Sequence, residues 1–254
     1  MAQLIKMEDY ISRYEIDLNR YANQFIRLKK QQWEEIKKRF ESIQFAHSTL
    51  DSEKQLFLDR IFNSQLVWAS STIREISPMD EAFEKDSLLK YFLQRFPDTY
   101  FVMYYPVFLI KKASVQGEII IIRPTDVVCL TALEYKENNV LIGTKQKFWL
   151  KRDDQGEKKI LSPIIGLERT ANIVKQILSN AEVDFPIRKI LLNRTGYIHA
   201  SELPADIEII DVRSYDDWFQ NMRRQPSPFK NMQLKAVKAL LASCATNAVK
   251  RFNE

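Results

Sequence analysis

The chain of 254 residues is 45% hydrophobic and 28% charged, which is enough for a full hydrophobic core without help from metals or disulfides. Its 38 basic and 33 acidic residues leave a modest formal charge of +5. Only 5 glycines occur, and neither GxGxxG nor GxxxxGK(S/T) is present, so the common glycine-cradled nucleotide sites are excluded.

The start of the chain and its cysteines predict a cytoplasmic protein with no membrane partner. The opening stretch MAQLIKMEDYISRYE places acidic residues where a signal peptide needs an apolar run. No segment approaches the roughly 20 apolar residues that cross a bilayer. Cys129 and Cys244 lie in apolar segments without CxxC spacing, so we expect buried, reduced thiols. Zinc ligands normally come in close pairs, which His47 and His199 do not provide.

Residues 1–76 show a helical pattern and no strand pattern. Trp33, Ile36, Phe40 and Ile43 recur at steps of three and four, which predicts one apolar stripe on a helix. The stretch STLDSEKQLFLDRIF then offers Ser and Asp as capping residues for a second helix. We expect this region to be a helical addition packed on the main domain.

A helix followed by a central sheet is predicted next. Ser77 and Pro78 are typical of a helix start, and Pro97 is expected to end that helix at Phe96. Four consecutive isoleucines indicate a strand covered on both faces, because a half-exposed strand would alternate polar and apolar residues. The extended segments expected after the helix are residues 99–110, 118–123, 126–134 and 139–151.

The remaining elements complete an α/β pattern. RDDQGEKK is expected to be an exposed turn, and a helix with one buried stripe begins at Pro163. Strands are expected at 187–193 and 207–212, and a final helix from Leu234 to Phe252. The sequence therefore predicts a mixed α/β protein with three regions: a helical region over 1–76, a core over 77–200 that contains the mixed sheet, and a basic C-terminal extension over 201–254.

Between Ser77 and Asn193 the sequence resembles the nuclease-related domain (NERD) family, a branch of the PD-(D/E)XK nuclease superfamily. Members have an acid opening the second strand, a Glu-x-Lys ending the third, a later Trp, and an Asn-Pro followed by Gln at the next helix. Glu118, Trp149 and the helix SPIIGLERTANIVKQIL occupy the matching places here. The resemblance implies a restriction-endonuclease-like core descended from a metal-dependent nuclease.

The same comparison predicts a damaged catalytic motif. Thr131 stands where the family has its metal-binding Glu, Leu133 where it has Lys, and Gly166 where it usually has Gln. A nuclease needs oxygen-rich ligands for Mg²⁺ and a cation near the scissile phosphate, and Glu118 is the one candidate ligand at the family positions. We therefore expect little or no catalysis and no cofactor, with Mg²⁺ or Mn²⁺ bound only if the protein is active.

Two rearrangements could restore a site. Glu134 and Lys136 preserve Glu-x-Lys three residues later, but strand alternation points them away from the face of Thr131 unless a bulge intervenes. The alternative is that EYKENN is a polar hairpin turn. Glu168, from the following helix, could supply a second carboxylate instead.

Basic residues are the candidates for nucleic-acid binding. Lys145, Lys147, Trp149 and Lys151 share one face at strand spacing, followed by Arg152, and such a pattern suits a phosphate backbone and an unstacked base. The lysines could instead protect an edge strand while the Trp lies in the core.

The C-terminal region adds Arg223 and Arg224 to a segment rich in basic residues. Three functions stay open. The first is a catalytically degenerate nuclease relative that binds DNA or RNA, the second a protein-interaction module or homodimer, and the third an active metal-dependent nuclease with a rearranged site. We expect them in that order.

Overall fold

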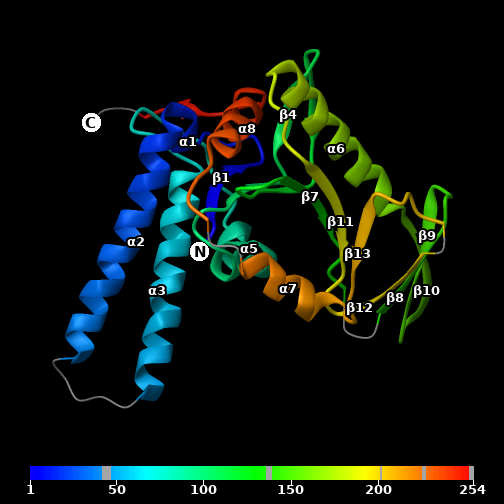
Figure 1. The fold of residues 1–254 in the computed structure, drawn as a ribbon, viewed down its shortest axis with the longest axis horizontal. Coiled ribbons are helices and arrows are strands. Elements are labelled where there is room, and N and C mark those ends of the chain that lie inside the picture. The colour runs from blue at the N-terminus through cyan, green and yellow to red at the C-terminus, as the bar shows by residue number, and fades with distance from the viewer. Residues whose placement is uncertain (42–46, 136–138, 201, 225–226, 252–254) are drawn as a thin grey trace.

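A six-stranded mixed sheet forms the centre of the protein (Figure 1). The structure, a computed structural model, describes residues 1–41, 47–135, 139–200, 202–224 and 227–251. Strand β6 runs antiparallel to both of its neighbours, and the other adjacent pairs are parallel. In order across the sheet, the strands are β1 (Gln3–Met7), β3 (Phe101–Tyr104), β6 (Ile119–Ile122), β7 (Val127–Ala132), β11 (Ile187–Leu192) and β13 (Ile207–Ile210).

Helices cover both faces of this sheet, as the isoleucine run predicts. All four isoleucines of β6 are fully buried. Helices α6 (Pro163–Asn180) and α8 (Asn231–Ala242) pack on one face, with α6 against β7 and β11 and α8 against β6. On the other face, α5 (Ser87–Arg95) packs against β3 and contacts α7 (Tyr215–Arg223) through aromatic rings (Figure 1). The expected mixed α/β architecture is confirmed.

A second, four-stranded sheet stands beside the first. Its order is β10 (Gly156–Leu161), β9 (Phe148–Asp153), β8 (Asn139–Gly143) and β12 (Gly196–Ala200), with β8 and β12 parallel. Trp149 is buried on its inner face, directly over Gly143. A Cβ at Gly143 would lie 2.6 Å from the Trp149 ring, so this close approach requires glycine.

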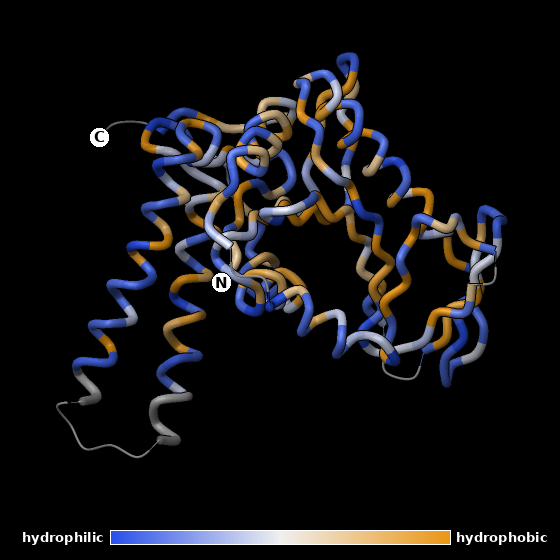
Figure 2. The backbone as a smooth tube through the Cα atoms, viewed as in Figure 1, coloured by the Kyte–Doolittle hydropathy of each residue, from blue (hydrophilic) through white to orange (hydrophobic). Residues whose placement is uncertain are grey.

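Two long helices extend from the body as an arm (Figure 1). They are α2 (Leu18–Glu41) and α3 (His47–Trp68), and the rings of Trp33 and Phe57 meet between them at 5.2 Å. Trp33 and Ile36 of the predicted stripe pack against the core, whereas the side chains of Phe40 and Ile43 lie outside the described part. Figure 2 shows hydrophobic residues recurring along α2 among polar ones. No helix in the described ranges is long and apolar enough to cross a membrane.

The remaining short elements join these layers. They are α1 (Arg13–Ile16), α4 (Ala82–Lys85), a hairpin of β4 (Val107–Ile110) with β5 (Ala113–Gln116), and a pair formed by β2 (Glu75–Ile76) with β14 (Val249–Lys250). Both cysteines are free thiols: Cys129 is buried and Cys244 half-buried.

The prediction that residues 1–76 contain no strand is wrong. Strand β1 is fully buried beside β3, and it includes the charged Lys6. The ammonium of Lys6 is satisfied by Glu15 at 2.7 Å and by Thr246 at 3.0 Å. Glu15 is nine residues away in the chain and Thr246 is 240 residues away, so the pairing that allows Lys6 to be buried is not visible in the sequence of the strand itself.

The predicted helix from Pro78 to Phe96 is also divided. The Ser77 hydroxyl accepts a hydrogen bond from the Ile11 backbone N–H at 2.8 Å, so it does not cap a helix. Asp86 is the N-cap of α5 instead, because its carboxylate accepts hydrogen bonds from the backbone N–H groups of Leu88 and Leu89.

Three other boundaries differ from the predictions. The segment 99–110 breaks into β3 and β4 at Tyr105, whose φ is 48°. RDDQGEKK is not only a turn, because β9 and β10 pair through it as a hairpin. The final helix ends at Ala242, and Cys244 instead forms an isolated bridge with Phe108.

The burial of β1 predicts a large stability effect near the N-terminus. Ile5→Ala should lower the free energy of unfolding by about 2–5 kcal/mol, because Ile5 is fully buried in the sheet. Ile16→Ala is the matched control, since Ile16 is 62% exposed and its loss should change stability by less than about 0.5 kcal/mol. Urea unfolding followed by circular dichroism measures both, and equal effects would contradict the placement of β1.

Candidate functional site

Glu118, Thr131 and Leu133, the residues of the expected NERD motif, lie at one end of the central sheet. Glu118 immediately precedes β6, and the antiparallel register of β6 and β7 places it across from Thr131. Leu133 follows the last residue of β7, where its N–H donates to the Leu192 carbonyl at 2.7 Å. The structure thus brings Glu118 and Thr131 together.

The Glu118 carboxylate is half-buried against helix α6. It lies so close to Gly166 that a Cβ at this position would collide with it. Burial raises the pKa of Glu118 above its usual range, and this effect outweighs the Thr131 hydroxyl and the Arg169 guanidinium, which both favour the ionised form. A carboxylate binds a metal ion in its ionised form, and burial here favours the protonated form instead.

The other two family positions contribute no charge. Thr131 and Leu133 are 8% and 6% exposed, respectively. The buried Thr131 hydroxyl lies beside the Glu118 carboxylate but outside good hydrogen-bond geometry, so its influence on that carboxylate is weak. These two positions therefore supply neither the second acid nor the cation that phosphodiester hydrolysis by a metal requires.

Glu134 is occupied by an ion pair. Its two carboxylate oxygens accept hydrogen bonds from Arg194, at 2.5 Å from Nε and 2.7 Å from Nη2. The Arg194 guanidinium carbon lies 3.9 Å from the centre of the Tyr91 ring. This pairing uses both oxygens that the first rearrangement would offer to a metal. Lys136, its proposed partner, lies outside the described residues.

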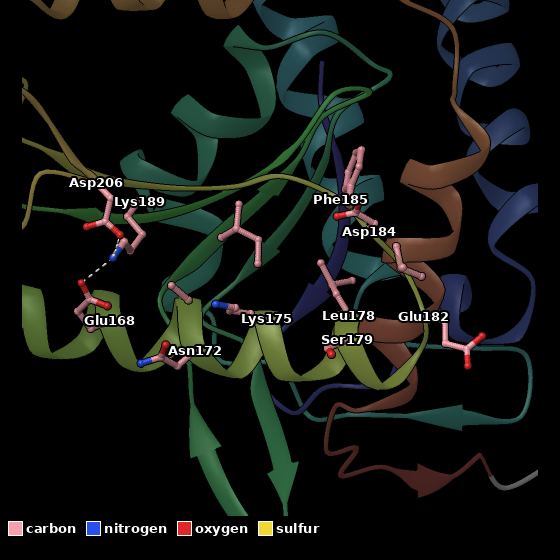
Figure 3. Close-up of a pocket in the computed structure, with 13 residues that line it drawn as sticks. Glu168, Asn172, Lys175, Leu178, Ser179, Glu182, Asp184, Phe185, Lys189 and Asp206 are labelled. Carbon is pink, nitrogen blue, oxygen red and sulfur yellow. Dashed lines mark hydrogen bonds and ion pairs between the residues drawn. The ribbon is translucent and has the colours of Figure 1, made fainter.

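Glu168 does not join Glu118 either. It accepts a hydrogen bond from Lys189 at 2.7 Å, and Lys189 also pairs with Asp206 at 2.6 Å (Figure 3). Burial alone would lower the pKa of Lys189, but the two carboxylates raise it overall. Lys189 is therefore held as a cation and is a poor base or nucleophile.

These residues line one wall of a cavity of about 710 Å³ between α6 and β11. Figure 3 shows Glu168, Lys189 and Asp206 at one end and Asp184 and Phe185 toward the other. At one end of this polar pocket, Lys189 is paired with Glu168 and Asp206, and Glu118 is not among the lining residues.

Three carboxylates nevertheless surround Tyr105, beside the end of β3. Burial, together with the nearby carboxylates of Glu118, Asp86 and Glu134, raises the pKa of Tyr105 to about 12. Asp86 is occupied by the α5 N-terminus and by the Tyr104 hydroxyl, which donates to it at 2.7 Å. Two of the three acids are therefore held by other partners: Asp86 by the start of α5 and Tyr104, and Glu134 by Arg194.

The residues do not fit a catalytic metal. Among the described residues, no group of three or more His, Cys, Asp or Glu side chains could hold a metal ion. Glu118 has a raised pKa and a neutral partner, whereas Mg²⁺ needs several oxygen ligands. We therefore assign no reaction step to this site.

The basic strand residues are placed differently from the prediction. Strand β9 begins at Phe148, so Lys145 and Lys147 lie in the preceding loop and are exposed. Trp149 is a core residue whose Nε1 donates to the Thr144 carbonyl at 3.1 Å. The prediction of one shared face is wrong for the two loop lysines.

The next two basic residues are already paired. Lys151 binds Asp153 at 2.7 Å and lies 4.8 Å from the centre of the Tyr135 ring. Arg152 pairs with Glu157 across the β9–β10 hairpin, with 2.8 Å between Nε and Oε1. Both are therefore weaker candidates for phosphate binding than the loop lysines.

Arg223 and Arg224 lie at the C-terminal end of α7, near α5 and away from β9 and β10 (Figure 1). Both are exposed. The Arg223 guanidinium carbon lies 5.1 Å from the centre of the Phe219 ring, and Arg224 donates to Gln220 at 3.0 Å. Neither forms an ion pair with a described residue.

The sequence interpretation missed exposed apolar residues on the second sheet. Phe148 is 52% exposed and Leu161 54%, and the two are paired across β9 and β10. The alternation of Phe148, Leu150 and Arg152 could have indicated such a face.

Comparisons with known proteins leave the family unassigned. No protein-family model matches the chain. A segment of 42 residues is 57% identical to an RNA 2',3'-cyclic phosphodiesterase from Geobacillus stearothermophilus, covering 16% of this chain and 13% of that protein. No solved structure matches.

The raised pKa of Glu118 predicts a pH-dependent stability effect. The folded state binds the Glu118 proton more tightly than the unfolded state, so this contribution is complete below the unfolded pKa of about 4.3 and lost as the pH rises. Glu118→Gln should therefore raise the melting temperature at pH 8 and leave it nearly unchanged at pH 4.

The control is Glu134→Gln, which breaks the ion pair with Arg194 and should lower stability at pH 8 by no more than about 1 kcal/mol. Scanning calorimetry at the two pH values measures both variants. A lower melting temperature for Glu118→Gln at pH 8 would indicate that the ionised carboxylate has a stabilising partner, such as a cation.

Proposed function

We propose that this protein is a catalytically degenerate relative of the NERD nucleases that binds nucleic acid through exposed basic residues. The order of elements supports the restriction-endonuclease-like part of this proposal. Within the central sheet, helix α5 is followed by β3, β6 and β7, then by α6 and by β11 parallel to β7. The β4–β5 hairpin interrupts this order after β3, and strands β8 to β10 of the second sheet interrupt it before α6. Glu118 enters the second of these strands, where the family has its acid.

The main observation in favour of a loss of catalysis is that the neutral Thr131, and not a second acid, lies opposite Glu118 on the neighbouring strand. Phosphodiester hydrolysis by a metal requires at least two hard oxygen ligands and charge neutralisation. At this end of the sheet, Asp86 caps a helix and Glu134 is held by Arg194. The remaining acid, Glu118, has a pKa raised by burial.

The proposed binding rests on cations that have no carboxylate partner. Lys145, Lys147, Arg223 and Arg224 are exposed, and none forms an ion pair with a described residue. Free cations release condensed counterions when they contact phosphates, which drives association with DNA or RNA. The short match to an RNA phosphodiesterase is a reason to test RNA beside DNA.

A protein-interaction module is the second candidate, and the arm of α2 and α3 favours it. This arm extends away from both sheets (Figure 1). On α3, Leu56 and Val67 are 50% and 48% exposed. Exposed apolar residues on a projecting helix suit a partner protein or a second copy of the chain.

Absence of nuclease activity is the first expected outcome. The purified protein should not cleave duplex DNA, single-stranded DNA or RNA in the presence of Mg²⁺ or Mn²⁺, because Thr131 and Leu133 supply neither the second acid nor the lysine of the NERD motif. Gel assays with labelled substrates test this. Metal-dependent cleavage that is lost with a chelator and with Glu118→Ala would contradict the proposal, and loss with Glu134→Ala or Glu168→Ala would identify the second ligand.

Salt-dependent binding is the second expected outcome. The logarithm of the association constant for duplex DNA should fall with the logarithm of salt concentration, at a slope of about −0.9 per phosphate contact. Lys145→Glu with Lys147→Glu, or Arg223→Glu with Arg224→Glu, should weaken binding and flatten the slope.

Lys111→Glu with Lys112→Glu provides a matched control, since these exposed lysines lie at the tip of the β4–β5 hairpin. Fluorescence anisotropy across a salt series measures all three double variants. No detectable binding at low salt would favour the protein-interaction alternative.

A further inference from the structure

The four-stranded sheet has one covered face and one open face. Side chains alternate along each strand, so register partners in neighbouring strands share a face. Leu141, Trp149 and Ile198 are buried on the covered face. The open face carries Val140, Ile142, Phe148, Leu150, Leu161 and Tyr197.

Two aromatic side chains are exposed on the open face. Phe148 is 52% exposed on β9, and Tyr197 is 38% exposed on β12. Each has a cation beside its ring: the Lys147 Nζ lies 5.8 Å from the Phe148 ring centre, and the Arg213 guanidinium carbon lies 5.8 Å from that of Tyr197. Asp211 already pairs with Arg213, so Lys147 is the cation of the two that is available to a phosphate. An aromatic surface with adjacent cations is what stacked bases and their phosphates require.

The charges on the open face favour a polyanion over an apolar partner. Glu157 is the one acid that the four described strands place on it, and Arg152 neutralises this acid. Lys159 on β10 shares the face and forms no ion pair with a described residue, and neither does Lys147. A nonpolar protein surface would leave these two cations desolvated and unpaired.

The register gives the separation of the two rings. Tyr197 pairs with Val140, which pairs with Arg152, four residues beyond Phe148 on β9. Strand rise and strand spacing then place the two aromatic positions about 16 Å apart, diagonally across the sheet. A short single strand can cover this distance and stack a base on each ring, whereas the bases of a duplex are already stacked on one another.

We propose that the open face binds single-stranded nucleic acid, with bases stacked on Phe148 and Tyr197 and phosphates beside Lys147 and Lys159. This inference rests on the proposed function and narrows it to one surface and one ligand form. The basic end of α7 has no part in it.

The test uses variants that remove a ring but keep apolar bulk. Phe148→Leu with Tyr197→Leu should weaken binding of a labelled twelve-nucleotide oligo(dT) by at least about fivefold per ring. The salt slope should stay unchanged, because no cation is lost. Binding of a labelled duplex of the same length should not change.

Tyr197→Phe is the control that retains a stacking surface, and it should bind oligo(dT) within twofold of the unmodified protein. Leu109→Ala on β4, which is 52% exposed on another surface, controls for lost apolar area. Circular dichroism should show all variants folded, since the substituted side chains are partly or largely exposed.

The possible results separate this inference from the proposed function. If the double leucine variant binds oligo(dT) as well as the unmodified protein while charge reversal at Lys145 and Lys147 weakens binding, the proposed function stands and the stacking face is refuted. Equal loss of duplex and oligo(dT) binding in the leucine variant also refutes it. If the unmodified protein binds neither ligand, both proposals fail.

Discussion

Strand β6 has no exposed side chain, and this constraint organises the rest of the fold. Its four isoleucines are fully buried, so both faces need a cover and both edges need a pairing strand. Helices α6 and α8 supply one cover and the layer containing α5 the other. A charged residue cannot enter such a strand without a partner, so Glu118 lies directly before its first residue, beside α6.

The central elements were predictable because their signals are local. The apolar runs of β6 and β7 and the buried stripe of α6 each lie within fewer than 20 consecutive residues. Strand β1 was not predictable in this way, since its buried Lys6 depends on Thr246 at the other end of the chain. Strand β10 was missed because Gly156–Leu161 is mostly exposed and charged, and it is fixed as a strand by pairing with β9.

The ion pairs at the candidate site were also not predictable from local sequence. The position of Glu118 at the start of a strand was predicted from the sequence, but the cations that bind the other candidate acids were not. Glu134 binds Arg194, which is 60 residues away, and Glu168 binds Lys189 on another element. A formal charge of +5 likewise does not say which cations are free, because Lys151 and Arg152 are paired while Lys147 is not.

The close contact between Gly166 and Glu118 makes the residues tolerated at these two positions depend on each other. Any side chain at 166 would occupy the space that the carboxylate now fills, so the Glu118 side chain would first have to turn away. The effect of a substitution at one position therefore depends on the residue at the other. With glycine at position 166 the Glu118 carboxylate can lie against the helix, whereas a larger residue there would place its own side chain where that carboxylate now lies.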